Sequence, residues 1–225
     1  PVKKLLISLG ILFIVVALSN TVSSFLYKIQ SKAPGTTIPV KDLTYIAPIK
    51  IGAQEALSVI LTKIPSTLRT KTNEPILGET FKDFVFIDKE TGMRITTEQF
   101  MSSWANTAPG QLTRALGDTF FIGIYSPVSS KNELSLIFNV TSPKQALAGM
   151  LAWENTLSGD LSSLYTQRSL LGSRFEDVIF RNTDVRVLRD DADRIRIGYT
   201  VVENTLLIST GSASLNALIE ASPAF

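Results

Sequence analysis

An acidic corner formed by Asp190, Asp191 and Asp193, followed by Glu203, is the clearest group of possible metal ligands in this chain. Carboxylate oxygens are the ligands that Ca²⁺ prefers. A calcium loop, however, spreads its oxygen ligands through a longer loop with a glycine at the sharp bend, and that pattern is missing here. Two arginines flank the corner. We therefore interpret it as a solvated turn between two strands and predict no metal site.

A second possible chemistry is glycoside hydrolysis, which uses two carboxylates on opposite sides of the scissile bond. Surface solvation is the ordinary interpretation of acidic residues at strand or helix ends, and core packing is the ordinary interpretation of tryptophans on or beside an apolar stripe. We keep a glycan hydrolase as an alternative function. Its candidate acids are Glu79, Asp83, Asp118 and Glu154, and its candidate sugar-stacking residues are Trp104 and Trp153.

Two absent residue types restrict the chemistry further. The chain contains no cysteine and no histidine, which excludes disulfides, thiolate catalysis, Ser-His-Asp hydrolysis and histidine-ligated zinc within this chain. The chain also lacks two motifs of serine nucleophiles, Ser-x-x-Lys and Gly-x-Ser-x-Gly. It lacks the glycine-rich loops that bind phosphate groups and dinucleotides. We predict no catalytic residues and no cofactor.

Charge gives no indication of nucleic-acid binding. The 22 basic and 20 acidic residues leave a net charge of +2, and the basic residues are scattered rather than clustered in a stripe. The tripeptide Asn139-Val140-Thr141 matches a glycosylation acceptor, but it lies at the end of an expected strand and matches by chance often. We predict no nucleic-acid partner and discount glycosylation.

The chemistry is therefore less informative than the N-terminal segment. Residues 5–27 carry no charged side chain, and a helix of that length spans roughly 30 Å, the thickness of the hydrocarbon core of a bilayer. We predict a retained transmembrane helix. The alternative is a secretory signal cleaved at Ala17-Leu18-Ser19, and a buried helix of a soluble domain is disfavoured because the segment has no polar face.

The segment also predicts how the helix sits in the membrane. Its polar second half could pack against another helix, and basic and aromatic residues lie where interfacial anchors belong. The short basic N-terminus ahead of a large domain favours a cytoplasmic N-terminus and an outside C-terminal domain. The predicted helix-packing residues are Asn20, Thr21, Ser23 and Ser24, and the predicted membrane-interface residues are Lys3, Lys4, Tyr27 and Lys28.

The chain divides into three regions. We predict an anchor over residues 1–28, a proline-containing juxtamembrane linker over 29–52 and an extracytoplasmic domain over 53–225. A division of that domain near residue 117 is an alternative. The chain starts at Pro1 rather than methionine, so we expect residues to precede it.

Periodicity predicts the elements of the domain. Apolar spacing predicts a helix over 53–63 stopped by Pro65, followed by a loop over 66–78. We expect a strand over 81–87, a turn, a helix capped by Thr96 and Gln99, and a second short helix that starts at Thr107 with Pro109 and closes at Gly117. Further expected elements are strands over 119–125 and 133–140, a helix from Pro143, a four-strand meander from Phe175 and a last helix over 213–221.

Strand runs without regular βαβ alternation predict an α+β fold. We expect an antiparallel sheet of hairpins with the helices packed on one face.

Three segments carry a resemblance to a known group of proteins. These are LGDTFFIGIY, ELSLIFNVTSPKQALAGM and YTVVENTLLISTGSASLNALIE, which fall within residues 115–221. Their hairpin, capped helix and final strand–turn–strand–helix pattern resembles uncharacterised bacterial envelope proteins anchored by a single membrane span. That resemblance implies the anchored α+β architecture and brings no active site.

Type IV pilins are less similar. Leu5 stands where a pilin would have glutamate, and Pro34 would break the helix soon after it leaves the membrane. The single-span assembly proteins of pilus and secretion machines resemble the predicted architecture more closely, at the level of fold only.

The function predicted from the sequence is non-enzymatic. We expect the outer domain to bind or scaffold partner proteins, or to self-associate, at the cell membrane. The alternatives are the carboxylate-dependent glycan hydrolase and a subunit of a surface filament.

Overall fold

The computed structural model describes residues 50–51, 55–74, 80–127, 131–164 and 174–221. Within these ranges the fold is α+β, as predicted. The helices are α3 (Ile64–Thr72), α4 (Thr97–Trp104), α5 (Gly110–Ala115), α6 (Pro143–Leu161) and α7 (Ser212–Ala221), with a short 3₁₀ turn at Leu61–Lys63. The strands are β1 (Lys50–Ile51), β2 (Glu55–Val59), β3 (Thr80–Asp88), β4 (Leu116–Ser126), β5 (Glu133–Val140), β6 (Phe175–Phe180), β7 (Thr183–Arg189), β8 (Ile195–Val202) and β9 (Thr205–Ser209).

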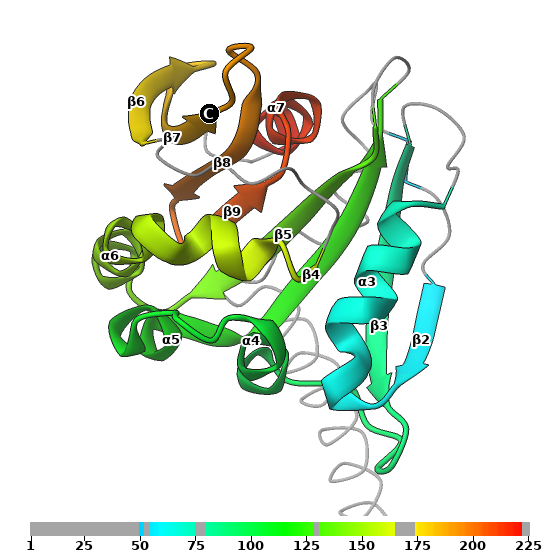
Figure 1. Ribbon diagram of the computed structural model, residues 1–225. Coiled ribbons are helices and arrows are strands. Elements are labelled where there is room, and N and C mark those ends of the chain that lie inside the picture. Colours follow the sequence, from blue (N-terminus) through cyan, green and yellow to red (C-terminus); the bar gives the residue numbers. More distant parts are fainter. Residues whose placement is uncertain (1–49, 52–54, 75–79, 128–130, 165–173, 222–225) are drawn as a thin grey trace, which may run out of the picture. The chain divides into compact units, whose positions relative to one another are not determined.

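The described strands form one nine-stranded sheet in the order β1-β3-β4-β5-β9-β8-β7-β6, with β2 also paired to β3 (Figure 1). Strands β3 to β9 pair antiparallel, whereas β1 and β2 run parallel to β3. The expected all-antiparallel sheet is therefore wrong, and the sheet is mixed.

The parallel pair arises from a β–α–β unit that the periodicity missed. Residues 55–59 form β2, not the predicted helix over 53–63, and α3 then carries the chain back to β3. Exposure along β2 alternates in a period of two, as expected for an edge strand with one covered face. Pro65 lies in the first turn of α3, where its missing N–H costs nothing, so it starts a helix instead of ending one.

Helices α3 to α6 cover one face of the sheet and form the larger hydrophobic core with it (Figure 1). Phe100 of α4 stacks on Phe120 of β4 with 4.6 Å between ring centroids. Trp104 packs on Trp153 of α6 at 5.5 Å. The predicted capping box is confirmed, because Thr96 Oγ1 accepts from the Gln99 N–H and the Gln99 side chain accepts from the Thr96 N–H.

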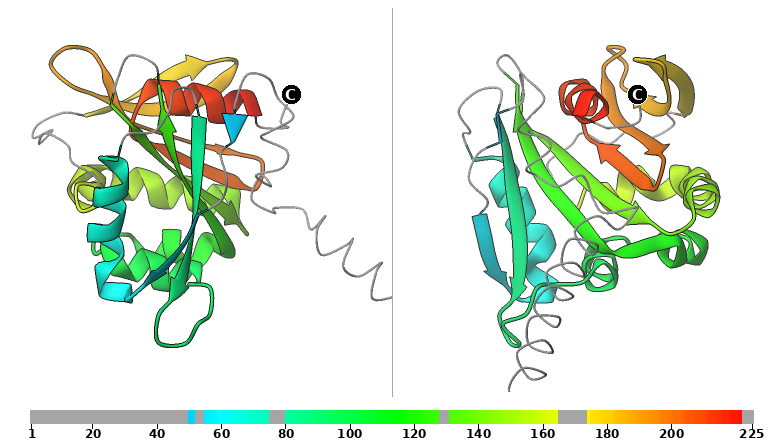
Figure 2. Two further views of the ribbon diagram at one scale, coloured as in Figure 1. Left: turned by 90° about the vertical axis from the view of Figure 1, so that its right-hand side faces the viewer. Right: turned by 180° about the vertical axis from the view of Figure 1, so that it is seen from behind.

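Helix α7 packs on the opposite face, so the expectation of helices on one face is wrong (Figure 2). Consecutive residues of the central strands are apolar on both sides: Phe120 joins the larger core and Phe121 the smaller one. A sheet that is apolar on both faces needs a cover on each. Gly198 of β8 leaves the space that Leu215 of α7 fills.

The hairpin of β4 and β5 and the meander from β6 to β9 are confirmed. Arg181 and Asn182 both have positive φ, the conformation that a two-residue turn matched to strand twist requires. The short helix α5 differs from its prediction: it begins after Pro109 without a side-chain cap. Thr107 binds Asp160 instead of capping that helix, and Gly117 lies inside β4.

Candidate functional site

The best-defined charged group of the domain is a clamp between α6 and the meander, formed by Glu154, Arg186 and Tyr199. Arg186 of β7 donates Nε to Glu154 Oε1 and Nη2 to Oε2, both at 2.8 Å. The Tyr199 hydroxyl of β8 donates to Glu154 Oε1 at 2.7 Å. A bidentate, charge-assisted pair of this kind fixes geometry as well as charge. The clamp therefore fixes α6 against the strands of the meander.

Strand register produces the clamp. Tyr199, Arg186 and Asp177 lie directly opposite one another on β8, β7 and β6, so their side chains share one face of the sheet. Arg186 Nη1 also pairs with Asp177 at 3.0 Å. The result is a continuous polar row from α6 to the outermost strand of the meander.

The clamp holds its groups in fixed protonation states. Burial, followed by the hydrogen bond to Glu154, raises the pKa of Tyr199 well above its ordinary value. The hydrogen bond to Glu154 is the largest cause that raises the pKa of Arg186. Tyr199 thus stays a neutral donor and Arg186 a cation at any physiological pH, and the Glu154 oxygens are occupied as acceptors. The arrangement suits positioning and recognition.

The elements that the clamp joins carry exposed residues that we call the recognition face: Leu147 and Leu151 of α6, Asp177 and Ile179 of β6 and Asp184 of β7. Leu147 and Leu151 share the helical stripe of Glu154, at spacings i, i+4 and i+7, so they point toward the meander side of α6. Their side chains are 41% and 45% exposed, and Ile179 is 76% exposed. Exposed apolar residues next to fixed charges are typical of protein-binding surfaces.

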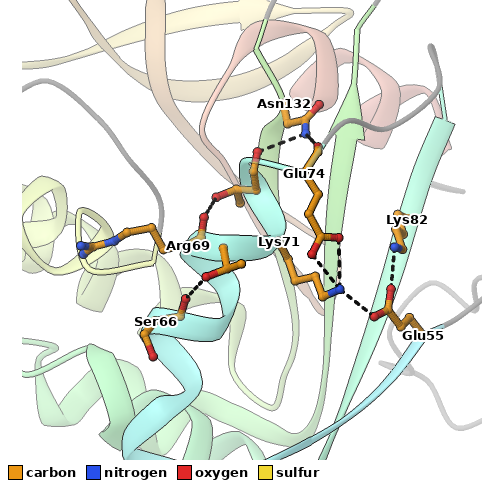
Figure 3. A network of polar contacts seen from close by, with 9 residues as sticks. Glu55, Ser66, Arg69, Lys71, Glu74, Lys82 and Asn132 are labelled. Atoms are coloured by element: carbon orange, nitrogen blue, oxygen red, sulfur yellow. Dashed lines mark hydrogen bonds and ion pairs between the residues drawn. The ribbon is translucent and has the colours of Figure 1, made fainter.

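A second polar network lies at the opposite end of the sheet, around the edge strand β2 (Figure 3). Glu55 of β2 accepts from Lys71 of α3 at 2.9 Å and from Lys82 of β3 at 2.5 Å. Lys71 also pairs with Glu74 at 2.9 Å, and Asn132 donates to the Glu74 carbonyl at 2.7 Å. Hydrogen bonds from Lys82 and Lys71 lower the pKa of Glu55. This network ties the edge strand β2 to its helix and its neighbour.

The acidic corner is a turn held by arginine. Asp190 accepts from Arg194 Nε at 2.9 Å and from the N–H groups of Ala192 and Arg194 at 3.0 Å. Arg194 lowers the pKa of Asp190 to about 2. Over residues 50–51, 55–74, 80–127, 131–164 and 174–221, no group of three or more carboxylates is arranged to hold a metal ion.

The candidate hydrolase acids come from separate elements. Asp83 is buried in β3, Asp118 is exposed near the start of β4, and Glu154 belongs to the clamp. Glu79 lies outside the described residues.

The two tryptophans are core residues. Trp104 and Trp153 are each 1% exposed or less. Trp153 donates its indole N–H to Asp160 at 2.9 Å, and Thr107 donates to the same carboxylate at 2.6 Å. Both therefore pack in the interior, which confirms the expectation of core packing over sugar stacking. Asn139, of the possible glycosylation tripeptide, lies within β5.

Sequence reasoning missed Arg186 and Tyr199, because only the pairing of distant strands brings them to Glu154. It also missed Glu133, the first residue of β5, whose buried carboxylate reaches the N-terminus of α7. Glu133 accepts from the Ser214 N–H at 2.7 Å and from the Ser214 hydroxyl at 2.8 Å. A carboxylate at a helix N-terminus satisfies unpaired N–H groups and the helix dipole. An acid that opens an otherwise apolar strand was the one available signal.

All predicted helix-packing and membrane-interface residues lie outside the described part of the chain: Lys3, Lys4, Asn20, Thr21, Ser23, Ser24, Tyr27 and Lys28. Among the helices that the structure describes, none combines the length and the hydropathy of a membrane span.

Comparison with protein-family models, with curated protein sequences and with solved structures gives no match for this chain. The resemblance to anchored bacterial envelope proteins stays a prediction.

Proposed function

We propose that this chain is a single-pass cell-envelope protein whose folded domain lies outside the membrane and binds partner proteins without a catalytic step. The apolar segment over residues 5–27 supports the anchor. Lys3 and Lys4 support a cytoplasmic N-terminus. The proposal assigns the bilayer contact to the N-terminal segment and the partner contact to the domain.

The recognition face is the observation that carries this proposal. Among the described residues it holds three of the five exposed large apolar side chains, Leu147, Leu151 and Ile179. Asp177, 86% exposed at its side chain, lies two residues before Ile179 on β6, at the outer end of the clamp. Apolar anchors next to a rigid charged group provide affinity and orientation together, which is what a docking surface needs.

The clamp keeps this surface rigid. Both oxygens of Glu154 are engaged, and α6 is held against β7 and β8 through them. A surface that is ordered before binding loses little conformational entropy on binding. This supports a scaffold that presents a fixed face to its partners.

The test is quantitative capture of partners from native membranes. The full chain is compared with Leu151→Lys on the recognition face and with Met93→Lys, a matched control at a side chain that is 65% exposed elsewhere in the domain. We expect Leu151→Lys to reduce recovery of a specific partner about tenfold, the effect of removing a binding hot spot. Met93→Lys should leave recovery unchanged. Equal recovery from all three chains would contradict a docking role for this face.

A second variant tests the predicted packing of the membrane helix. Changing Asn20 and Ser23 to leucine removes the polar groups that could bond to a neighbouring helix. Loss of a partner from this variant alone would assign that contact to the membrane segment. An unchanged partner set and stoichiometry would show that the packing role is wrong.

A further inference from the structure

Strand β6 is the last strand of the sheet order, so one of its edges has no partner strand within the described residues. An unpaired edge presents a row of N–H and C=O groups that can accept another strand. β6 runs over six residues, Phe175 to Phe180, and pairs with β7 without a bulge. It is a regular template for strand addition.

Strand β6 lacks two of the residue types that usually block such an edge. Its sequence, FEDVIF, contains no lysine and no proline. Its only charges, Glu176 and Asp177, are paired with Arg189 at 2.5 Å and with Arg186 at 3.0 Å on β7. Each carboxylate is therefore partly balanced by an arginine of β7, and Ile179 stands largely exposed on the edge.

We propose that two copies of this chain pair through β6, antiparallel and edge to edge, so that two sheets join into one. A second copy fits this edge because two antiparallel registers avoid setting like charges opposite each other. Pairing centred on Val178 sets Asp177 opposite Ile179, and pairing centred on Ile179 sets Val178 opposite Phe180. Neither register places like charges opposite each other. Pairing centred on Asp177 would oppose two carboxylates and is excluded.

The contact is small, since a single short strand buries far less than the roughly 1,000 Å² expected of a stable interface. We therefore expect weak pairing in dilute solution. Here the inference rests on the proposed function: anchoring two copies in one membrane raises their local concentration, as a short linker raises it to about the millimolar range. We therefore expect the dimer to form when the protein is anchored in a membrane.

Disulfide trapping tests the pairing, because a chain without cysteine allows single-cysteine variants with no background. The full chain is reconstituted in liposomes as Val178→Cys, Ile179→Cys and the control Met93→Cys, and then exposed to a mild oxidant. Directly opposite residues in an antiparallel pair are close enough to be bridged. At micromolar protein, we expect one of the two β6 cysteines to cross-link about a hundredfold faster than the control cysteine.

A double variant should lower the cross-linking rate of Val178→Cys. Adding Ile179→Asp to Val178→Cys sets an aspartate opposite Asp177 of the second copy in the register centred on Val178, and we expect the cross-linking rate to fall at least tenfold, because like charges directly opposite each other are destabilising. Ile179 is exposed, so the fold does not depend on it. Rates equal to those of the Met93→Cys control, or unaffected by the aspartate, would overturn the pairing.

The two proposals fail in different ways. If cross-linking equals the control while Leu151→Lys still removes a partner, self-pairing is wrong and partner binding stands. If the chain does not stay with the lipid, the anchor is wrong. The same cysteine variants at millimolar concentration without lipid then decide the strand pairing alone.

Discussion

The two ends of the sheet are built in opposite ways. At one end the edge strand β2 carries Glu55, which is held by Lys71 and Lys82 from two neighbouring elements (Figure 3). At the other end β6 carries Glu176 and Asp177, each paired with one arginine of β7, and exposes Ile179. We call the β2 end the protected end, because its acid is held by side chains from two neighbouring elements. The acids of β6 are held from one side, and Ile179 beside them is exposed.

The largest effect should come from removing Arg186. Arg186→Ala leaves Glu154, whose side chain is 15% exposed, without its cation and loosens the meander that carries β6. We expect the free energy of unfolding to fall by about 3 kcal/mol, as for other largely buried pairs that lose one partner. Urea denaturation measures it. Arg114→Ala, at an exposed position of α5, is the control, and a loss below about 1 kcal/mol in Arg186→Ala would show that the clamp does not hold this end.

Tyr199→Phe should have a smaller effect at the same end. It removes one hydrogen bond to an ionised carboxylate and keeps the ring that packs on Phe175 with 5.6 Å between centroids. We expect a loss of about 1–2 kcal/mol at neutral pH.

The pH dependence of that loss identifies its cause. The pKa of Tyr199 is raised in the folded state, so its contribution is fully present below the ordinary tyrosine pKa of about 10 and declines as pH rises above it. Stability measured from pH 8 to pH 11 should therefore fall more steeply in the wild type than in Tyr199→Phe. Parallel curves would contradict this assignment.

The protected end should respond less. Glu55→Gln removes the charge that joins Lys71 and Lys82, but this network is partly exposed, so we expect a loss of about 0.5–1 kcal/mol. Glu74→Gln, which touches only Lys71 among the ion pairs of this network, is a matched comparison and should cost less. Thermal denaturation in low and high salt separates the electrostatic part, because salt screens exposed pairs. If Glu55→Gln lowered the free energy of unfolding as much as Arg186→Ala, the two ends of the sheet would not differ in this respect.

Acid should release the protected end gradually, which is the smallest of the four effects. Hydrogen bonds from Lys82 and Lys71 lower the pKa of Glu55 in the folded state. Its contribution is therefore fully present above the ordinary glutamate pKa of about 4.3 and is lost as pH falls through the lower folded value. NMR titration of the Glu55 carboxylate should give a midpoint below 4.3, and a midpoint at or above it would contradict the network.

Local patterns predicted the central and C-terminal elements well. Thr96 and Gln99 identified a helix start because a capping box is encoded within four residues. The β6–β7 turn was predicted because asparagine tolerates positive φ, as Asn182 does. The β2 segment was predicted as helix because five residues are too few to separate a period of two from a period of 3.6.

The candidate site depends on register, which no local pattern encodes. Glu154 was named as a candidate acid, but Arg186 and Tyr199 reach it only because β7 and β8 pair with Arg186 opposite Tyr199. The same holds for Thr107 and Asp160, which belong to different segments and meet only when the chain after α4 packs on α6. Long-range pairing sets these contacts, and a sequence read along its length does not reveal them.

The position of β9 constrains how the domain can fold. β9 fills the place between β5 and β8, yet it is synthesised after β6, β7 and β8. Until β9 arrives, the finished hairpin of β4 and β5 has an unpaired edge, and the first three strands of the meander have no sheet to join. Contacts of such sequence separation form slowly. During synthesis the free edge of β5 therefore stays open to solvent until β9 has emerged.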